Sequence, residues 1–242
     1  MIIMSFQNKP MKCVILCAGK GTRLGAENTP KPLYKIKGKP ILYYIIKFWK
    51  KFTNDFIFVV GYKKEMIIDF VKKLPINAEY VEQKELKGIA HATHLTKYKV
   101  TERFIVVLGD CICSGNFIFP KKMENGFGMI KTNDINTIRN SFSVEVENGV
   151  AKKLIEKPSE PKTNLCGMGF YFFTKKVFEY ISMTSPSKMR NEIEITDVMQ
   201  KMIDSGEILK PVVLEGRYIN ITYPEDIKKA KKIIEDENDR ID

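Results

Sequence analysis

The sequence predicts an α/β fold with a mostly parallel central sheet. One reason is a near-continuous apolar run at residues 12–18, the pattern of a strand covered on both faces. Another is the alternation of strand-like and helix-like segments over residues 12–108, which is typical of βαβ units with right-handed crossovers. The third is an ordinary composition, with 44% hydrophobic and 29% charged residues in 242, which provides enough apolar material for a core.

Each element of the first half has its own signal. The strand at residues 12–18 is followed by a helix at residues 40–52, where apolar side chains recur on one helical face and Pro40 suits the first turn. Gly61 then follows one strand, and Pro75 follows one helix. The remaining expected elements are a strand at 55–60, a helix at 63–73, a strand at 78–82, a helix at 88–97 and a strand at 104–108.

The second half of the chain predicts a mixed or antiparallel sheet that is interrupted by short helices. Asn148-Gly149 is a strong hairpin signal. Thr196 is expected to cap a helix that stops at Gly206, and residues 222–225 have the capping-box spacing that begins the last helix. The expected strands are 127–131, 142–146, 151–156 and 169–173.

The chain contains no linker, repeat or low-complexity segment. Residues 1–242 are therefore expected to form one domain. Residues 1–10 are a candidate disordered lead-in, because Met11 stands immediately before the first strand and could be an alternative start. This N-terminal segment is too short and too polar for a signal peptide.

Charge and cysteine content narrow the classes of function. The net charge of +11 suits nucleic acid, an anionic membrane surface or small phosphorylated ligands, but the lysines are spread over the polar sides of predicted helices. That spread favours solvated helix faces over a nucleic-acid surface. No apolar run approaches ~20 residues, so no membrane span is predicted. Five cysteines without a Cys-x-x-Cys pair indicate buried hydrophobic side chains in a reducing cytoplasm.

The most informative stretch is residues 16–33, LCAGKGTRLGAENTPKPL, which follows the first apolar run. Gly19 and Gly21 let the backbone approach an anion closely, and Arg23 and Lys31 supply positive charge, so the stretch predicts a phosphate-binding loop. A Walker A loop is excluded because the chain has no Gly-Lys-Ser or Gly-Lys-Thr. A dinucleotide-binding fingerprint is excluded because the third glycine comes one position too late. A flexible surface loop with incidental charges is the alternative.

Three further places combine polar groups with predicted strands or helices. Asp110 directly follows a predicted buried strand. A carboxylate in this position could bind a Mg²⁺ ion whose other ligands are substrate phosphates. The alternative is an aspartate in a solvated turn. Lys157 also ends a strand and could hold a second phosphate or form a surface salt bridge. His91 and His94 lie three apart on a predicted helix, but no third ligand has matching spacing, so packing or surface positions are favoured over metal ligation.

Seven motifs follow one another over residues 11–235. They are LCAGKGTRL with PKPL at 16–33, Gln83 with GIA at 88–90, LGD at 108–110, EKP at 156–158, GMGFY at 167–171, EIEITD at 192–197 and NITYPED at 220–226. In this order they resemble the sugar-phosphate nucleotidylyltransferases, also called nucleotide-sugar pyrophosphorylases, and most closely the glucose-1-phosphate thymidylyltransferase and uridylyltransferase members. The resemblance implies a Rossmann-like three-layer α/β/α sandwich. It also implies transfer of a nucleoside monophosphate from an NTP to a sugar 1-phosphate, with release of pyrophosphate.

The resemblance implies catalytic and metal-binding roles. Arg23 would stabilise charge on the phosphates in the transition state, and Lys31 would neutralise charge near the reacting α-phosphorus. Asp110 would bind Mg²⁺ together with Asn220, which stands where the family usually has a second metal aspartate. An asparagine carbonyl can ligate Mg²⁺ but adds no negative charge. Asp110 and the nucleotide phosphates would therefore supply the negative charge that holds the ion. These roles fit positioning and electrostatic stabilisation of an in-line attack by one phosphate on another.

The resemblance assigns further residues to the two substrates. Lys157 would hold the sugar phosphate, Glu156 a sugar hydroxyl, and Gly167 would face the sugar. The family's Tyr-Gly-x-Val near the sugar is replaced by SFSV at 141–144, which is expected to reshape the sugar pocket and puts glucose in doubt. Gln83 and Gly88 would read the base edge, as in members that use UTP or dTTP. The implied nucleotide-binding residues are Leu16, Ala18, Gly19, Lys20, Gly21, Thr22, Gln83 and Gly88.

Several substrates and functions stay open at this point. The favoured donor is dTTP or UTP and the favoured acceptor a hexose 1-phosphate; a CTP-dependent enzyme for another phosphorylated acceptor, such as inositol phosphate, is the alternative within the class. A non-catalytic nucleotide-sugar-binding protein, prompted by Asn220, and a nucleic-acid binder, prompted by the charge, come from other classes. The expected partners are an NTP, a sugar 1-phosphate and Mg²⁺, without nucleic acid or membrane; a homo-oligomer is left open.

Overall fold

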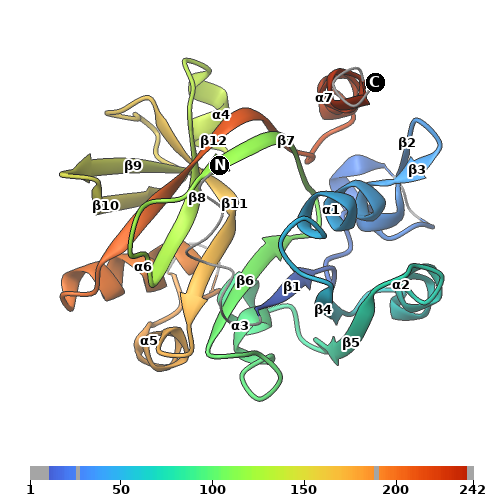
Figure 1. Cartoon of the computed structure of the whole chain (residues 1–242), viewed down its shortest axis with the longest axis horizontal. Helices are drawn as coiled ribbons and strands as arrows, with labels where there is room; N and C mark the ends of the chain where they lie inside the picture. Colours follow the sequence, from blue (N-terminus) through green and yellow to red (C-terminus); the bar gives the residue numbers. More distant parts are fainter. Residues whose placement is uncertain (1–10, 26–27, 188–190, 239–242) are drawn as a thin grey trace.

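The structure is a computed structural model that describes residues 11–25, 28–187 and 191–238, so the expected lead-in at residues 1–10 lies outside the described part of the chain. Figure 1 shows the elements. In chain order they are β1 (Lys12–Leu16), the 3-10 helices η1 (Thr22–Leu24) and η2 (Lys31–Leu33), β2 (Lys35–Ile36), β3 (Lys39–Pro40), α1 (Ile41–Trp49), β4 (Asp55–Val60), α2 (Lys64–Val71), β5 (Asn77–Glu82), α3 (Gly88–His94), β6 (Arg103–Leu108), β7 (Cys111–Ile118), β8 (Asn125–Lys131), α4 (Ile135–Arg139), β9 (Phe142–Glu147), β10 (Val150–Glu156), β11 (Leu165–Thr174), α5 (Val177–Met183), α6 (Ile195–Asp204), β12 (Leu209–Asn220) and α7 (Asp226–Asn238).

The main sheet has the strand order β5-β4-β1-β6-β11-β8-β12-β7, and β9 and β10 extend it beside β11. The strands β5, β4, β1 and β6 pair in parallel, as the βαβ pattern predicted. Within this order, β11 and β7 run opposite to the other strands, because β11 is antiparallel to β6 and β8, and β7 is antiparallel to β12. The prediction of a mostly parallel central sheet is therefore confirmed.

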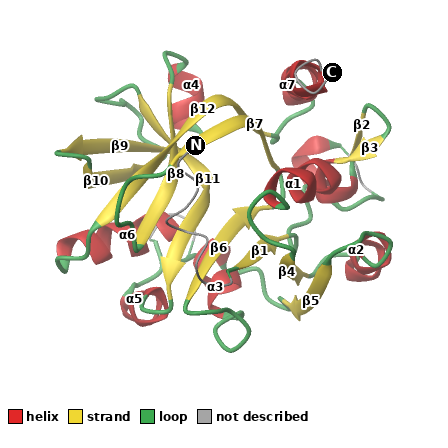
Figure 2. Ribbon diagram, viewed as in Figure 1, coloured by secondary structure: helices red, strands yellow, loops and turns green. Residues whose placement is uncertain are grey.

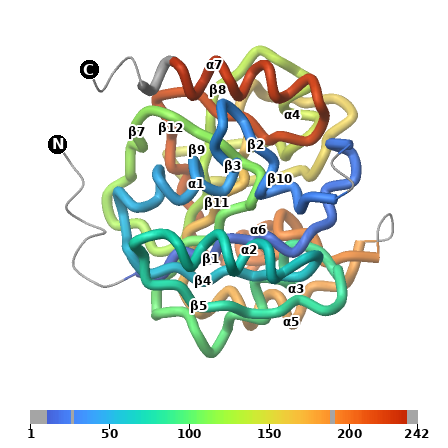
Figure 3. Tube along the Cα trace, turned by 90° about the vertical axis from the view of Figure 1, so that its right-hand side faces the viewer, coloured from blue at the N-terminus to red at the C-terminus, as the bar shows by residue number. Residues whose placement is uncertain are grey.

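Helices cover both faces of the sheet (Figure 2). Residues of α1, α2 and α7 share one hydrophobic cluster, and residues of α3, α5 and α6 share a second. Successive side chains of β1 point to opposite faces of the sheet: Cys13 and Ile15 belong to the first cluster, and Val14 belongs to the second. Figure 3 shows α7 over the end of the sheet formed by β7 and β12, and α2 near β5. This arrangement is the predicted three-layer α/β/α sandwich.

Two long strands, β7 and β12, were not predicted. Polar residues and glycines interrupt the apolar alternation that would have indicated a strand in either sequence, and β12 also contains Pro211. The pair is close-packed at Gly115 and Gly216, which lie opposite each other; a Cβ at Gly216 would lie only 1.9 Å from the carbonyl oxygen of Ser114. Glycines therefore serve a close backbone approach here rather than a turn.

Two predicted helix caps are wrong, although the helices they announced are present. Thr196 lies inside α6, and its hydroxyl donates to Glu156 instead of serving as the N-cap. At the start of α7, the carboxylate of Asp226 accepts from the backbone N–H groups of Thr222 and Tyr223, at 2.8 Å each. The Asp226 carboxylate, one position after Glu225, thus reaches back to the backbone as the glutamate of the expected capping box would have done.

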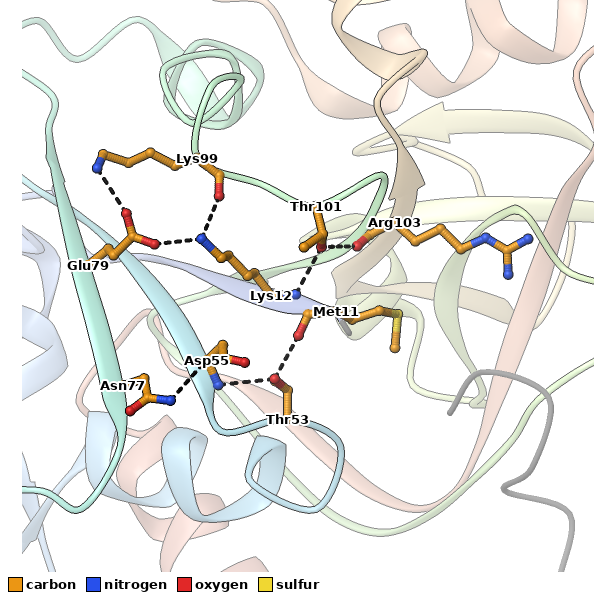
Figure 4. Close-up of polar contacts among 9 residues, drawn as sticks. All are labelled: Met11, Lys12, Thr53, Asp55, Asn77, Glu79, Lys99, Thr101 and Arg103. Carbon is orange, nitrogen blue, oxygen red and sulfur yellow. Dashed lines mark hydrogen bonds and ion pairs between the residues drawn. The ribbon is translucent and has the colours of Figure 1, made fainter. Parts of the chain in front are cut away.

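A polar network ties the amino ends of the parallel strands together (Figure 4). Lys12 Nζ donates to Glu79 Oε1 at 2.6 Å and to the carbonyl of Lys99 at 2.8 Å, while Lys99 Nζ donates to Glu79 Oε2 at 2.9 Å. The Thr53 hydroxyl donates to the carbonyl of Met11 at 2.6 Å. This edge is stabilised by local contacts, and the opposite, carboxyl edge of the same strands carries the cavity described next.

Candidate functional site

A cavity of about 370 Å³ lies at the carboxyl ends of β1, β5 and β6, and β4 lies between β1 and β5 in the sheet. Backbone hydrogen bonds hold these strand ends together: the N–H of Cys17 donates to Val59 at 2.7 Å, and the N–H of Gly109 donates to Leu16 at 3.0 Å. A Cβ at Gly109 would lie 2.4 Å from the carbonyl oxygen of Leu16, so only glycine permits this approach. The position agrees with the rule that ligands of α/β folds collect at the carboxyl ends of parallel strands.

The glycine-rich loop forms one wall of this cavity. Leu16, Ala18, Gly19 and Gly21 line it. Gly21 has φ +65°, and a Cβ there would lie 2.3 Å from Cβ of Lys31, so the glycine lets the loop pack directly on that lysine. The remaining predicted loop residues, which are Lys20, Thr22 and Arg23, are exposed at the surface of the loop.

Lys31 and Asp110 meet in the cavity. Lys31 Nζ lies 2.5 Å from Asp110 Oδ2, and the two side chains are only 13% and 25% exposed. The other carboxylate oxygen of Asp110, Oδ1, accepts a hydrogen bond from Cys111 Sγ at 3.5 Å. Burial raises the pKa of the Cys111 thiol, and the neighbouring Asp110 carboxylate raises it further, so the thiol keeps its proton for this contact. All five cysteines are buried and free, as predicted.

The far wall of the cavity contains the predicted base-reading residues. Gln83 is only 5% exposed and lines the cavity, and its amide Nε2 lies 3.1 Å from Nδ1 of His91. Gly88 has φ +90°, and a Cβ there would lie 3.1 Å from Cβ of Glu192 and from the carbonyl oxygen of Ile193. The EIEITD motif therefore packs directly against the start of α3.

Glu156 and Lys157 lie at the end of β10, in the second half of the fold. Glu156 Oε2 accepts from the Thr196 hydroxyl at 2.7 Å, and Glu156 Oε1 lies 3.8 Å from Lys157 Nζ. Lys157 has φ +44°, and its N–H donates to the carbonyl of Ser141 at 2.7 Å. A positive φ is uncommon for lysine, and the surrounding contacts hold this residue in it.

Tyr171 connects this region to the cavity. It is 3% exposed; burial raises the pKa of its phenol, and the carboxylates of Glu156, Glu194 and Asp110 contribute. Glu194 itself lines the cavity. The tyrosine thus lies among acidic groups from both halves of the fold. Neither Glu194 nor Tyr171 was predicted as a site residue, although both belong to motifs that the sequence contains.

Gly167 and Phe142 form a matched pair in the core. A Cβ at Gly167 would lie 1.9 Å from Cζ of Phe142, whose ring is 2% exposed and packs edge-on against Phe127 at 5.6 Å. The carbonyl of Gly167 accepts from the Ser141 hydroxyl at 2.7 Å. The phenylalanine that replaces the family's glycine therefore occupies space that Gly167 leaves open in the core. The role of Gly167 toward a sugar stays a prediction.

Asn220 lies next to Asp110 in the backbone but lines a different cavity. The N–H of Ile221 donates to the carbonyl of Asp110 at 2.9 Å. The side chain of Asn220 belongs to a second cavity, of about 270 Å³, together with Ser141 and Tyr218. Tyr218, which was not predicted, accepts from the N–H of Gly169 at 3.0 Å and connects to Cys111 Sγ at 3.1 Å.

The donor atoms at Asp110 fit a metal ion that a substrate shares. In the described residues, no group of three or more histidine, cysteine, aspartate or glutamate side chains gathers as a metal site. One carboxylate in the wall of the cavity matches the way Mg²⁺ is usually held, by one or two carboxylates plus phosphate oxygens and water. Asp110 therefore fits such an ion only if the phosphates complete its shell.

Comparisons with known proteins agree with this geometry. A family model for nucleotidyl transferase matches residues 12–238. The bifunctional protein GlmU of Methanocaldococcus jannaschii is 35% identical over 239 residues, which are 93% of this chain and 55% of that protein, so this chain spans about half the length of that relative. The UTP–glucose-1-phosphate uridylyltransferase AglF of Haloferax volcanii is 34% identical over 240 residues, which are 94% of this chain and 98% of that protein.

A solved structure points the same way. A Bacillus anthracis protein named as a glucose-1-phosphate thymidylyltransferase superposes with a TM-score of 0.80 at 26% identity, over 92% of this chain and 94% of that one. No helix in the described ranges is long and apolar enough to cross a membrane. The family that the seven motifs predicted is confirmed, and this chain belongs to the nucleotidyl transferase family.

Proposed function

We propose that this chain catalyses the Mg²⁺-dependent transfer of a nucleoside monophosphate from UTP or dTTP to a sugar 1-phosphate, with release of pyrophosphate. The observation that carries the proposal is the contact of Lys31 with Asp110 at 2.5 Å inside the cavity that the glycine-rich loop and Gln83 also line. A cation for phosphates, a carboxylate for a metal and an amide for a base are thereby collected in one place.

The nucleotide would lie along the carboxyl edge of the parallel strands. Its triphosphate would follow the loop at Gly19 and Gly21, where the backbone can approach closely, with Lys20 and Arg23 at the exposed side. Lys31 would neutralise charge near the α-phosphate. Mg²⁺ at Asp110, when bound, supplies further positive charge and orients the phosphate oxygens. These contributions are positioning and electrostatic stabilisation.

The acceptor would bind on the side of the mixed sheet. Lys157 would hold its phosphate as a point charge, and Glu156 would accept from a sugar hydroxyl. The names of two relatives support this choice of substrates: the Haloferax volcanii protein is named for UTP and glucose 1-phosphate, and the Bacillus anthracis protein for thymidylyl transfer to glucose 1-phosphate. Phe142 stands where the family pattern has a glycine, so the assay below includes several hexose 1-phosphates as acceptors.

A matrix of NTPs against phosphorylated acceptors, scored by pyrophosphate release, tests the proposal. UTP, dTTP, CTP, ATP and GTP would be combined with several hexose 1-phosphates and with inositol phosphate. We expect turnover with UTP or dTTP and a sugar 1-phosphate. Turnover with CTP and inositol phosphate alone would move the chain to the alternative within the class. Tight binding of a nucleotide sugar without pyrophosphate at any Mg²⁺ concentration would make it a binding protein.

Asp110→Asn tests the metal role within the same assay. We expect Mg²⁺-dependent turnover to fall by about 100-fold or more, because the amide lacks the charge that holds the cation. Asp69→Asn is the matched control, since Asp69 is an exposed aspartate on α2. Near-normal activity of Asp110→Asn would refute the metal role of Asp110.

A further inference from the structure

A chain of hydrogen bonds leads from the backbone of β11 to the carboxylate of Asp110. The N–H of Gly169 donates to the Tyr218 hydroxyl at 3.0 Å. The same hydroxyl lies 3.1 Å from Cys111 Sγ, and Cys111 Sγ donates to Asp110 Oδ1 at 3.5 Å. The four residues come from β11, β12, the start of β7 and the turn after β6. The carboxylate is therefore held from behind by parts of the fold that are far apart in the sequence.

The two ends of this chain of hydrogen bonds fix its direction. A backbone N–H can only donate, and a carboxylate that is ion-paired with Lys31 can only accept. The thiol has one proton, which Oδ1 accepts, so the Tyr218 hydroxyl donates to Sγ. In the reverse direction Oδ1 would lose its donor. The phenol proton would also have no acceptor among the described residues, where the hydroxyl contacts only Gly169 and Cys111.

The backbone around Gly169 permits these contacts. The register of β11 against β8 shifts over residues 167–171, and such a bulge re-aims backbone groups. A Cβ at Gly169 would lie 2.6 Å from Cys111 Sγ, so glycine leaves the space that the thiol occupies. Cys111 is 1% exposed, and the Tyr218 ring packs edge-on against Phe170 with centroids 5.6 Å apart. Packing thus holds both the thiol and the phenol in place.

A hydrogen bond to Oδ1 determines how the carboxylate of Asp110 is turned. Oδ1 accepts from the buried thiol, whereas Oδ2 contacts Lys31, which lines the same cavity as Asp110. A carboxylate whose rotation is restricted presents the same oxygen to each incoming cation and loses less freedom on binding it. This restriction matters more where Asn220 adds no negative charge that could compensate for a poorly oriented ligand.

We propose that Cys111 and Tyr218 are positioning residues that hold the carboxylate of Asp110 with Oδ2 available to the metal ion. Tyr218 acts through Cys111, because the phenol proton lies on Sγ and the thiol proton is thereby directed at Oδ1. Partners behind a metal ligand typically strengthen metal binding by about 10- to 100-fold. The inference rests on the proposed function, since it takes Asp110 as the metal ligand.

Mn²⁺ binding to the whole, nucleotide-free chain, measured by electron paramagnetic resonance, tests both residues. We expect Cys111→Ala to weaken binding by about tenfold. Tyr218→Phe keeps the ring and should weaken it by about threefold, near the low end of what one hydrogen bond contributes. The double variant should bind no more weakly than Cys111→Ala alone, because the hydroxyl acts only through the thiol. Cys111→Ser can still accept one proton and donate another, so it should retain most of the affinity.

Tyr44→Phe and Cys13→Ala are the matched controls. The Tyr44 hydroxyl donates to the carbonyl of Ile36 at 2.7 Å, and Cys13 is fully buried on β1. Both variants should bind Mn²⁺ as the wild type does, and circular dichroism would verify that each variant is folded. Wild-type affinity in Tyr218→Phe, or losses that add in the double variant, overturns the inference. If Cys111→Ala does not fold, the comparison of Tyr218→Phe with Tyr44→Phe decides.

Asp110→Asn separates this inference from the proposed function. If it abolishes Mn²⁺ binding while the Cys111 and Tyr218 variants bind normally, the inference is wrong and the proposed reaction stands. Weaker binding in those variants, without any pyrophosphate release by the wild type, would retain the inference and refute the reaction. Mn²⁺ binding that is absent from the wild type, or unchanged in Asp110→Asn, also overturns the inference, because no ion is then held at Asp110.

Discussion

Lys31 competes with any cation for the carboxylate of Asp110. Its Nζ lies 2.5 Å from Oδ2, in a place where both side chains are largely shielded from solvent. Removing either partner leaves the other charge poorly compensated. A triphosphate in the loop offers Lys31 other oxygens, which would release Asp110. Nucleotide and metal binding are therefore expected to support each other at this pair of residues.

Lys31→Met should separate these two effects. With the neighbouring positive charge removed, Asp110 should bind Mn²⁺, used as a spectroscopic substitute for Mg²⁺, about tenfold more tightly in the nucleotide-free protein. Turnover should fall by roughly 100-fold, because the charge near the phosphates is lost. Electron paramagnetic resonance of Mn²⁺ measures the first effect and pyrophosphate release the second. Lys35→Met, at an exposed position of β2, is the control; equal Mn²⁺ affinity in all three proteins would contradict the competition.

The sequence predicted which side chains the proposed site contains, but not the contacts between them. Lys31 and Asp110 are 79 positions apart, so their ion pair exists only once η2 packs against the end of β6. Phe142 was expected to reshape the sugar pocket, whereas its ring fills the space above Gly167 in the core. Tyr218 carried no signal at all, since it lies in a strand that the pattern did not reveal. In each case the contact depends on tertiary packing between residues that are far apart in the sequence.

At the scale of elements, the sequence predicted those features that depend only on neighbouring residues. Asn148 and Gly149 have φ values of 52° and 75°, as a two-residue hairpin between β9 and β10 requires. The strands β7 and β12 were missed because they gain their order from each other, through eight paired positions that end at Asn220 and Cys111. A strand whose polar residues are paired by a partner far along the chain shows little alternation of its own.

The network at the amino ends of the strands predicts a pH-dependent part of the stability. Hydrogen bonds from Lys12 and Lys99 lower the pKa of Glu79 in the folded state. A lowered folded-state pKa contributes stability that is present above the unfolded pKa, about 4.3, and is lost as the pH falls through the folded pKa. Glu79→Gln should therefore destabilise the chain near pH 7 and lose that effect in acid.

Urea unfolding at a series of pH values measures this contribution. Because the Glu79 side chain is 41% exposed, we expect a loss of at most ~1 kcal/mol in the free energy of unfolding at pH 7. Glu102→Gln provides the control, as Glu102 is an exposed glutamate just before β6. A difference between Glu79→Gln and wild type that stays constant into the acid range would show that the carboxylate charge is not responsible.

At the scale of the whole molecule, the two halves of the sheet divide the proposed substrates. The parallel half provides the loop, Gln83 and Asp110, and these follow from the regular βαβ pattern that the sequence displays. The mixed half provides Glu156 and Lys157, on strands whose order along the sheet no local pattern contains. Tyr171, on β11 between the two halves, is near acidic groups of both. The nucleotide side was therefore predictable in more detail than the acceptor side.

This division predicts that a change in the mixed half alters the acceptor requirement alone. Lys157→Ala should raise the KM for the sugar 1-phosphate by about tenfold or more and change the KM for the NTP little, because the lost charge lies at the end of β10, outside the lining of the nucleotide cavity. Steady-state kinetics with each substrate varied in turn measures the two constants. Lys153→Ala, at an exposed position of the same strand, should leave both unchanged. Equal increases in the two KM values for Lys157→Ala would place this lysine on a group that both substrates share, and the division of the sheet between nucleotide and acceptor would then be wrong.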